Sequence, residues 1–207
     1  MHKKYFILPL LCLAFACKQK TVTNLHAVTS TKDTTKLPQI SAAQLIDPGK
    51  SIGLTHLNES LDSVILHLGK PDRGDAAMGA AFTTWFAQHD TLGHETDIYS
   101  HRTMGGPDEN INHVKLIRVT SPYFKTVQGV GTGLSLAEIG KHFKVEHIAD
   151  YIKATDTLMV YDDTKEGISF EIDKSGKCTG VSVHKPNDAS TGYLSLHPGS
   201  QYLRVKK

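Results

Sequence analysis

Two matching stretches decide the expected fold: SLDSVILHL at residues 60–68 and SLAEIGKHF at residues 135–143, which are offset by 75 positions. Apolar residues recur in both at helical spacing. Ser135 and Glu138 form a capping box in the second stretch, whereas Asn58 or Ser60 can cap the first and Gly69 can end it. We therefore expect two amphipathic helices of about three turns each. Their expected buried residues are Leu61, Val64, Leu68, Leu136, Ile139 and Phe143.

Strand-like runs follow each expected helix. In residues 168–172, apolar Ile168, Phe170 and Ile172 alternate with Ser169 and Glu171, which is typical of a strand with one buried face. The full set of runs is 82–87, 96–100, 114–120, 158–161, 168–172 and 179–184, and residues 173–177 form a hairpin turn with Gly176 at a positive φ. The pattern predicts an α+β fold of two tandem repeats, each a short helix packed on a three-stranded antiparallel meander. Repeat 1 would span residues 37–122, and repeat 2 with a C-terminal extension would span residues 123–207.

A family resemblance is carried by the segments around the first helix. Residues 51–54 (SIGL), 60–64 (SLDSV) and 68–72 (LGKPD) resemble the opening motif of BamE/SmpA-like repeats, which are also called β-lactamase-inhibitory-protein-like. Residues 131–139 (GTGLSLAEI) resemble the same opening at the second repeat, although the Gly-Lys-Pro stop is replaced there by Lys144-Val145-Glu146. The resemblance implies a protein-binding or assembly module with no catalytic residue.

The N-terminus has the pattern of an export signal. Lys3 and Lys4 precede an apolar run of 11 residues, 5–15, which is too short to span a bilayer. Ala16-Cys17 at the end of this run resembles the lipobox of bacterial lipoproteins, and the resemblance implies cleavage after Ala16 and lipid attachment at Cys17. A plain cleaved signal is the alternative. We expect a signal peptide at 1–16 and a lipidated, flexible tether at 17–36, with the protein in the outer membrane facing the periplasm.

Charge and cysteine content restrict the function further. Loss of Lys3 and Lys4 with the leader reduces the 23 Lys and Arg by two, which balances the 21 Asp and Glu. A neutral chain lacks the basic surface of nucleic-acid-binding proteins, so no nucleic-acid partner is expected. With Cys17 lipidated, Cys178 has no partner for a disulfide, and its place in a strand predicts a small buried apolar residue.

Candidate site residues fall into two groups. His89, His94 and His101 with nearby acids form weak metal-ligand candidates, but their spacing matches no local metal signature, so we expect no metal and no cofactor. Trp85 and Phe86 are adjacent in one strand and must point to opposite faces, so one of them, together with Tyr99, is a candidate contact for a partner. No hydrolase or protease signature occurs, so an enzyme is not expected.

These observations predict a lipid-anchored envelope protein that acts as a non-catalytic protein- or peptide-binding module. Its partners would be the membrane, through Cys17, and another envelope protein or a peptide. Two alternatives remain: a His-dependent metal- or small-ligand-binding envelope protein, and an envelope hydrolase.

Overall fold

The computed structural model describes residues 40–188, 196–197 and 199–205. Residues 38–207 group as one compact unit, and the boundary expected between residues 122 and 123 falls inside it. The predicted signal peptide, Cys17 and tether lie outside the described residues. Within the described part of the chain, no helix is both long enough and apolar enough to cross a membrane.

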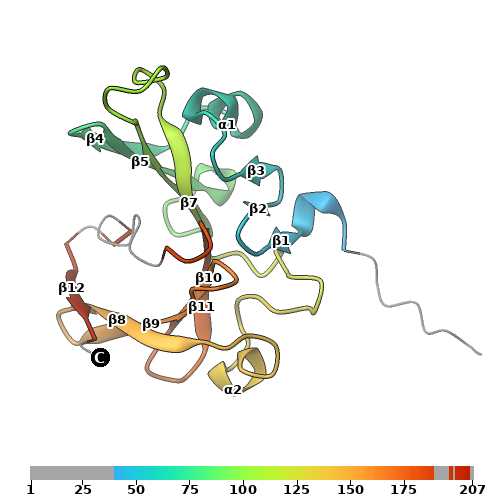
Figure 1. Ribbon diagram of the computed structural model, residues 1–207. Helices are drawn as coiled ribbons and strands as arrows, with labels where there is room; N and C mark the ends of the chain where they lie inside the picture. The colour runs from blue at the N-terminus through green and yellow to red at the C-terminus, as the bar shows by residue number, and fades with distance from the viewer. Residues whose placement is uncertain (1–39, 189–195, 198, 206–207) are drawn as a thin grey trace, which may run out of the picture. The chain divides into compact units, whose positions relative to one another are not determined.

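Two antiparallel sheets hold most of the regular secondary structure of the described chain (Figure 1). A short 3-10 helix, η1 (Ala42–Gln44), precedes a three-stranded sheet of β1 (Ile46–Asp47), β2 (Ser51–Ile52) and β3 (Thr55–His56). The larger sheet has nine strands in the order β12-β8-β9-β10-β11-β7-β6-β5-β4. Its strands are β4 (Arg73–Ala77), β5 (Ala80–Phe86), β6 (Glu95–His101), β7 (His113–Val119), β8 (Glu146–Lys153), β9 (Asp156–Asp163), β10 (Ile168–Ile172), β11 (Cys178–His184) and β12 (Gln201–Arg204). A 3-10 turn, η2 (Ala87–His89), follows β5.

The predicted α+β class with two helix-on-meander repeats is wrong. The regular secondary structure of the described residues is mainly strand, and the only α-helices among them are α1 (Leu61–Leu68) and α2 (Leu136–Ile139). The strands do not form two separate three-stranded units, because β7 pairs with β11 from Leu116 to Val119 and joins the two expected meanders into one sheet. The strands β4 and β8 also extend the expected meanders to four consecutive strands each, and β12 adds a further strand beside β8.

The two helices start where the sequence predicts, but they are shorter than expected. Ser60 caps α1 by accepting a hydrogen bond from the Ser63 amide, and Ser135 with Glu138 completes the capping box of α2. The helix α2 ends after four residues at Gly140, since glycine is a poor helix former. Of the six expected buried residues, Val64, Ile139 and Phe143 are buried, Leu61 and Leu136 are half-buried, and Leu68 is exposed at the end of α1.

All six predicted strands are confirmed, and Gly176 has the expected positive φ of 79° in the turn between β10 and β11. The sequence did not reveal β4, because its residues, Arg-Gly-Asp-Ala-Ala, are poor strand formers. All five are exposed at the sheet edge, so the pairing with β5 holds this strand in place.

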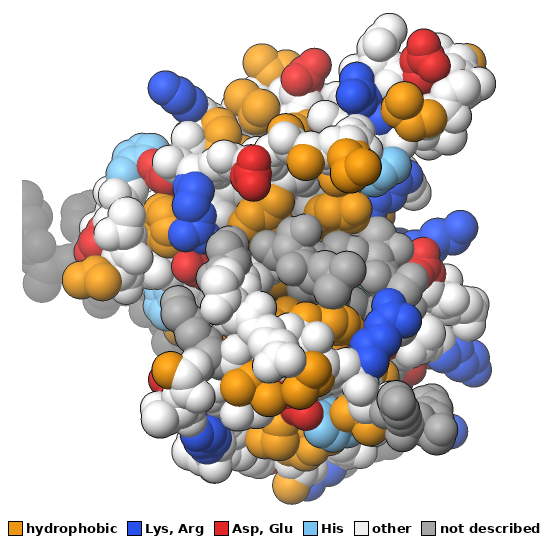
Figure 2. Space-filling model, turned by 90° about the vertical axis from the view of Figure 1, so that its left-hand side faces the viewer, with side chains coloured by type: hydrophobic (Ala, Val, Ile, Leu, Met, Phe, Trp, Pro, Cys, Tyr) orange, Lys and Arg blue, Asp and Glu red, His pale blue; other side chains and the backbone are white. Residues whose placement is uncertain are grey.

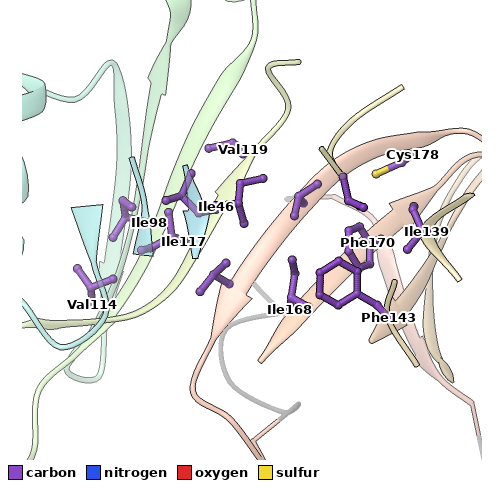
Figure 3. Packing of buried hydrophobic residues seen from close by; sticks show 14 of the residues in the cluster. Ile46, Ile98, Val114, Ile117, Val119, Ile139, Phe143, Ile168, Phe170 and Cys178 are labelled. Atoms are coloured by element: carbon purple, nitrogen blue, oxygen red, sulfur yellow. The ribbon is translucent and has the colours of Figure 1, made fainter. Parts of the chain in front are cut away.

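The main core lies on one face of the large sheet. Val64 of α1, Ile139 of α2 and Ile46 of β1 pack there against the sheet's aliphatic and aromatic residues. Figure 3 shows two parts of this cluster: Ile46 near Ile117, and Phe143 near Phe170, whose ring centroids are 5.5 Å apart. In Figure 1, α1, α2 and the small sheet are all on this side. The other face, which we call the helix-free face, carries a smaller apolar cluster of Phe82, Leu116, Ala149, Tyr151, Val160 and Leu196.

Candidate functional site

A polar row crosses the helix-free face at a single level of the strand register. It takes one residue from each of eight strands: Glu146, Asp162, Ser169, Ser182, Arg118, Asp97, Thr84 and Arg73, in order from β8 to β4. The six central members are buried, whereas Glu146 and Arg73 at its ends are exposed. Buried polar groups must be hydrogen-bonded to be tolerated, so the partners of this row define the chemistry of the face.

Arg118 is the centre of the row and binds three carboxylates. Its Nε and Nη2 donate to the two oxygens of Glu171 at 3.0 and 2.7 Å, which is a bidentate pair. Its Nη1 donates to Asp97 Oδ2 at 2.6 Å and to Glu95 Oε2 at 2.9 Å. Asp97 also accepts from the Thr84 hydroxyl at 2.7 Å, and His197 lies 2.9 Å from Glu171 through Nε2. We call Arg118, Asp97, Glu95, Glu171 and His197 the Arg118 cluster.

Burial and ion pairing act against each other in this cluster. Burial alone would favour a neutral Glu171, but the charges of Arg118 and His197 hold the pKa of its carboxyl well below the usual range. Burial is the stronger influence at Asp97 and raises the pKa of this carboxyl despite Arg118. The guanidinium of Arg118 stays charged, because Glu171 and Asp97 raise its pKa although burial opposes this.

Gly180 of β11 makes room for the Arg118 cluster. Arg118 in β7 and Glu171 in β10 lie on either side of β11, so their side chains meet above it. A Cβ at position 180 would lie 2.6 Å from Glu171 Oε2 and 3.3 Å from Arg118 Nε. A glycine inside a strand often marks such a close approach.

A second buried pair, His184 and Asp162, lies on the same face. Both side chains are 0% exposed, and His184 Nε2 is 2.8 Å from Asp162 Oδ1. Its Nδ1 lies 3.0 Å from the carbonyl oxygen of Lys185. Because both ring nitrogens face acceptors, both can donate only if the imidazole is protonated. Burial alone would lower the pKa of His184, but the hydrogen bond and charge of Asp162 raise it above the ordinary value.

The free energy of unfolding should therefore fall as the pH rises through the folded-state pKa of His184. A histidine with a raised pKa contributes its full stabilisation below the unfolded value of about 6.5 and loses it above the folded value. Urea unfolding between about pH 5.5 and 9 measures this dependence of the free energy of unfolding on pH. In His184→Gln, the free energy of unfolding should fall less over this range. His142→Gln, at an exposed histidine, should keep the wild-type slope. An unchanged slope in His184→Gln would contradict the assignment.

A pocket of about 660 Å³ opens on the helix-free face beside the Arg118 cluster. Glu95 and His197 of the cluster lie in its wall. The start of β9 and the turn after β10 form another part of it, and Tyr151, Leu158 and Leu196 give it an apolar side. Its other lining residues are Arg73, Asp156, Thr157, Asp173, Lys174, Ser175 and Ser200. Figure 2 views this side of the molecule, where hydrophobic side chains lie among charged side chains of both signs.

The predicted aromatic contact patch is not an exposed surface. Trp85 and Phe86 do point to opposite faces, but they are only 7% and 8% exposed. Trp85 packs in the main core and donates from Nε1 to the Gly69 carbonyl at 2.9 Å. Phe86 lies on the helix-free face under the guanidinium of Arg73, 5.5 Å from the ring centroid. Tyr99 is half-buried against the smaller apolar cluster. These three residues therefore contribute to packing and do not form the exposed contact patch that the sequence predicts.

The three histidine candidates are not brought together. His94 comes just before β6 and His101 is its last residue, so the length of the strand, roughly 20 Å, separates them. His89 instead lies 2.6 Å from Asp72 through Nδ1. Among the residues that the structure describes, no three His, Cys, Asp or Glu side chains are grouped as metal ligands.

Cys178 lies where its sequence context predicts, buried at 2% exposure and not in a disulfide. Burial, assisted by the negative charge of Glu171, raises the pKa of its thiol to about 12. A thiol in this state is an inert core residue.

The sequence reasoning missed Arg118, Glu171 and His197 as members of a site. Alternation in β10 predicts Glu171 on a solvated face, yet it is only 3% exposed because Arg118 and His197 meet it there. The available signal was Gly180 between the strand residues Thr179 and Val181, since an interior glycine indicates that something passes close to the backbone.

Comparisons with known proteins give no family for this chain. No family model and no curated protein matches it, so the resemblance to BamE/SmpA-like repeats stays a prediction. Among solved structures, the chain is similar to an extracellular protein containing an SCP domain from Bacillus anthracis str. Ames, with a TM-score of 0.40 and 11% identity. The match covers 79% of this chain and 54% of that chain, so it spans about half of the other protein. A likeness of this size carries no conclusion about fold or function.

Proposed function

We propose that this protein is a lipid-anchored envelope protein, in the outer membrane facing the periplasm, that binds a peptide segment of another envelope protein without catalysing a reaction. The pocket on the helix-free face is the proposed site. The observation that supports the proposal is the wall of this pocket, which combines an apolar side with charged groups that the fold holds in place. A site of this composition is suited to orienting a bound chain.

The charges beside the pocket support binding over chemistry. Arg118, Asp97 and Glu171 are nearly fully buried and are joined by short ion pairs. The lowered carboxyl pKa of Glu171 and the raised pKa of Arg118 keep both groups charged, so they suit orienting a ligand better than transferring a proton. The described thiol, Cys178, is buried with a raised pKa, which does not suit a nucleophile.

Site-specific photo-crosslinking in intact cells tests the pocket. A photo-reactive amino acid at Thr157, in the pocket wall, should give a defined crosslinked product. The same group at Leu54, which is 59% exposed in the turn between β2 and β3, is the control and should not give that product. Ser200→Trp, which fills the pocket, should remove the Thr157 product. Equal products at both positions, or a Thr157 product that persists in Ser200→Trp, would contradict the proposed site.

Membrane fractionation of the same cells tests the anchor. Cys17→Ala removes the acyl attachment point and should leave either uncleaved precursor or soluble protein. A Cys17→Ala protein that stays in washed membranes with the processed mass of wild type would show that Cys17 is not the anchor.

A further inference from the structure

We infer that the pocket on the helix-free face binds a primary ammonium group, the end of a lysine side chain, and that Glu95 is its carboxylate partner. The inference rests on the proposed peptide-binding function and names the side chain that the site recognises. It follows from the position of Glu95, the charge balance of the Arg118 cluster and the shape of the pocket wall.

Glu95 connects the buried cluster with the pocket. The backbone N–H of Glu95 donates to the Thr120 hydroxyl at 2.8 Å, which fixes the start of β6. Its Oε2 accepts from Arg118 at 2.9 Å, and among the described residues its Oε1 has no donor. The side chain is 30% exposed and lines the pocket, whereas Asp97 and Glu171 are 1% and 4% exposed. Glu95 is therefore the carboxylate of the cluster that a ligand can reach.

The cluster has more negative than positive charge. Three carboxylates, those of Asp97, Glu95 and Glu171, face only two basic side chains in the cluster, Arg118 and His197. Opposite charges interact strongly where water is excluded, so a cation beside Glu95 is favoured. The phenol of Tyr151, in the same wall, also senses this negative charge. Burial first, and then the charge of Glu171, raise its pKa.

The basic residues at the rim already have partners. Arg73 donates from Nη2 to the Thr84 hydroxyl and lies over the ring of Phe86. Lys174 donates to the carbonyl of Thr155 in the turn between β8 and β9. Neither contacts Glu95, so the carboxylate facing the pocket has no lysine or arginine partner other than Arg118 among the described residues.

The apolar side of the pocket fits the stem of a lysine. Leu158 and Leu196 lie in the wall with the ring of Tyr151, which is 4.4 Å from the His197 ring. Lysine buries its four methylene groups along apolar surface while its ammonium meets polar groups. An aromatic ring beside the cation adds attraction. The wall therefore favours a cation on an aliphatic stem over a free inorganic cation.

Three small probes test the inference by NMR titration of the full chain. These are Nα-acetyl-lysine methylamide, its Nε-acetylated neutral form and Nα-acetyl-glutamate methylamide. The lysine probe should shift the amide signals of residues 95, 157–158 and 197, and the other two should not. Glu95→Gln should weaken the binding of the lysine probe roughly tenfold, since the free energy of a hydrogen bond to a charged group corresponds to about such a change in affinity. Asp108→Asn, which removes an exposed carboxylate from the loop between β6 and β7, is the control and should bind like wild type.

The outcomes separate this inference from the proposed function. Equal binding of the neutral probe, preferred binding of the glutamate probe, or an unchanged affinity in Glu95→Gln would overturn the lysine assignment. Loss of binding in Glu95→Gln counts as support only if the unfolding transition of the variant matches wild type. We expect this match, because Arg118 keeps Asp97 and Glu171 as partners in that variant. If the Thr157 crosslink forms but the lysine probe does not bind, the peptide-binding proposal stands and the lysine inference fails.

Discussion

Arg118→Met should lower the free energy of unfolding by about 3–5 kcal/mol, because a broken buried ion pair leaves uncompensated charge in a dry environment. Asp97 and Glu171 would stay buried without the guanidinium that both bind. Urea unfolding followed by circular dichroism measures the change.

Arg73→Met is the matched control, since it makes the same substitution in the same polar row. Arg73 is exposed at the sheet edge and makes one long hydrogen bond of 3.4 Å to Thr84, so its loss should cost about 0.5 kcal/mol. Adding Glu171→Gln to Arg118→Met should recover part of the loss, because one of the unpaired charges is then removed. Equal effects of Arg118→Met and Arg73→Met would mean that the cluster does not stabilise the fold.

Gly180→Ala should lower the free energy of unfolding by about 1–3 kcal/mol, the usual cost of overpacking a dense interior. The new methyl group would lie 2.6 Å from Glu171 Oε2. This carboxylate has little freedom to retreat, because Arg118 and His197 both hold it. Urea unfolding at neutral pH gives the difference from wild type.

Gly74→Ala is the control for this substitution. Gly74 also lies within a strand, β4, but the nearest atoms to an added Cβ are 3.4 Å away, which is ordinary contact. The variant should be neutral or slightly more stable, because alanine restricts the unfolded chain. A Gly180→Ala protein as stable as Gly74→Ala would show that the cluster can move away from β11.

The fold was predictable from the sequence where local patterns decide the structure. Ser60 and Ser135 cap the two helices as expected, because a cap depends only on neighbours along the chain. Alternation identified β10 with its exact limits. The join between β7 and β11 was not predictable, because the paired residues are more than 60 positions apart and no local pattern encodes their register.

The site was harder to predict than the fold, for a related reason. Glu171 has the spacing of a solvated residue, and only its contact with Arg118, 53 positions earlier, explains its burial. The candidate residues chosen from the sequence do not form a common site. Trp85 and Phe86 are nearly buried, and the three candidate histidines are not grouped as metal ligands among the described residues. Composition indicates which groups are present, whereas their convergence depends on the strand order.

The distance along the chain between Arg118 and Glu171 also affects how the protein is made. Arg118 leaves the ribosome 53 residues before Glu171, so its main partner does not yet exist when β7 has been synthesised. Asp97 and Glu95 are already present, but in water an ion pair contributes little. The first strands therefore cannot complete their buried charge network until late in synthesis. For the exported chain proposed above, we expect this order to delay stable folding, which would suit passage of the unfolded polypeptide through a secretion channel.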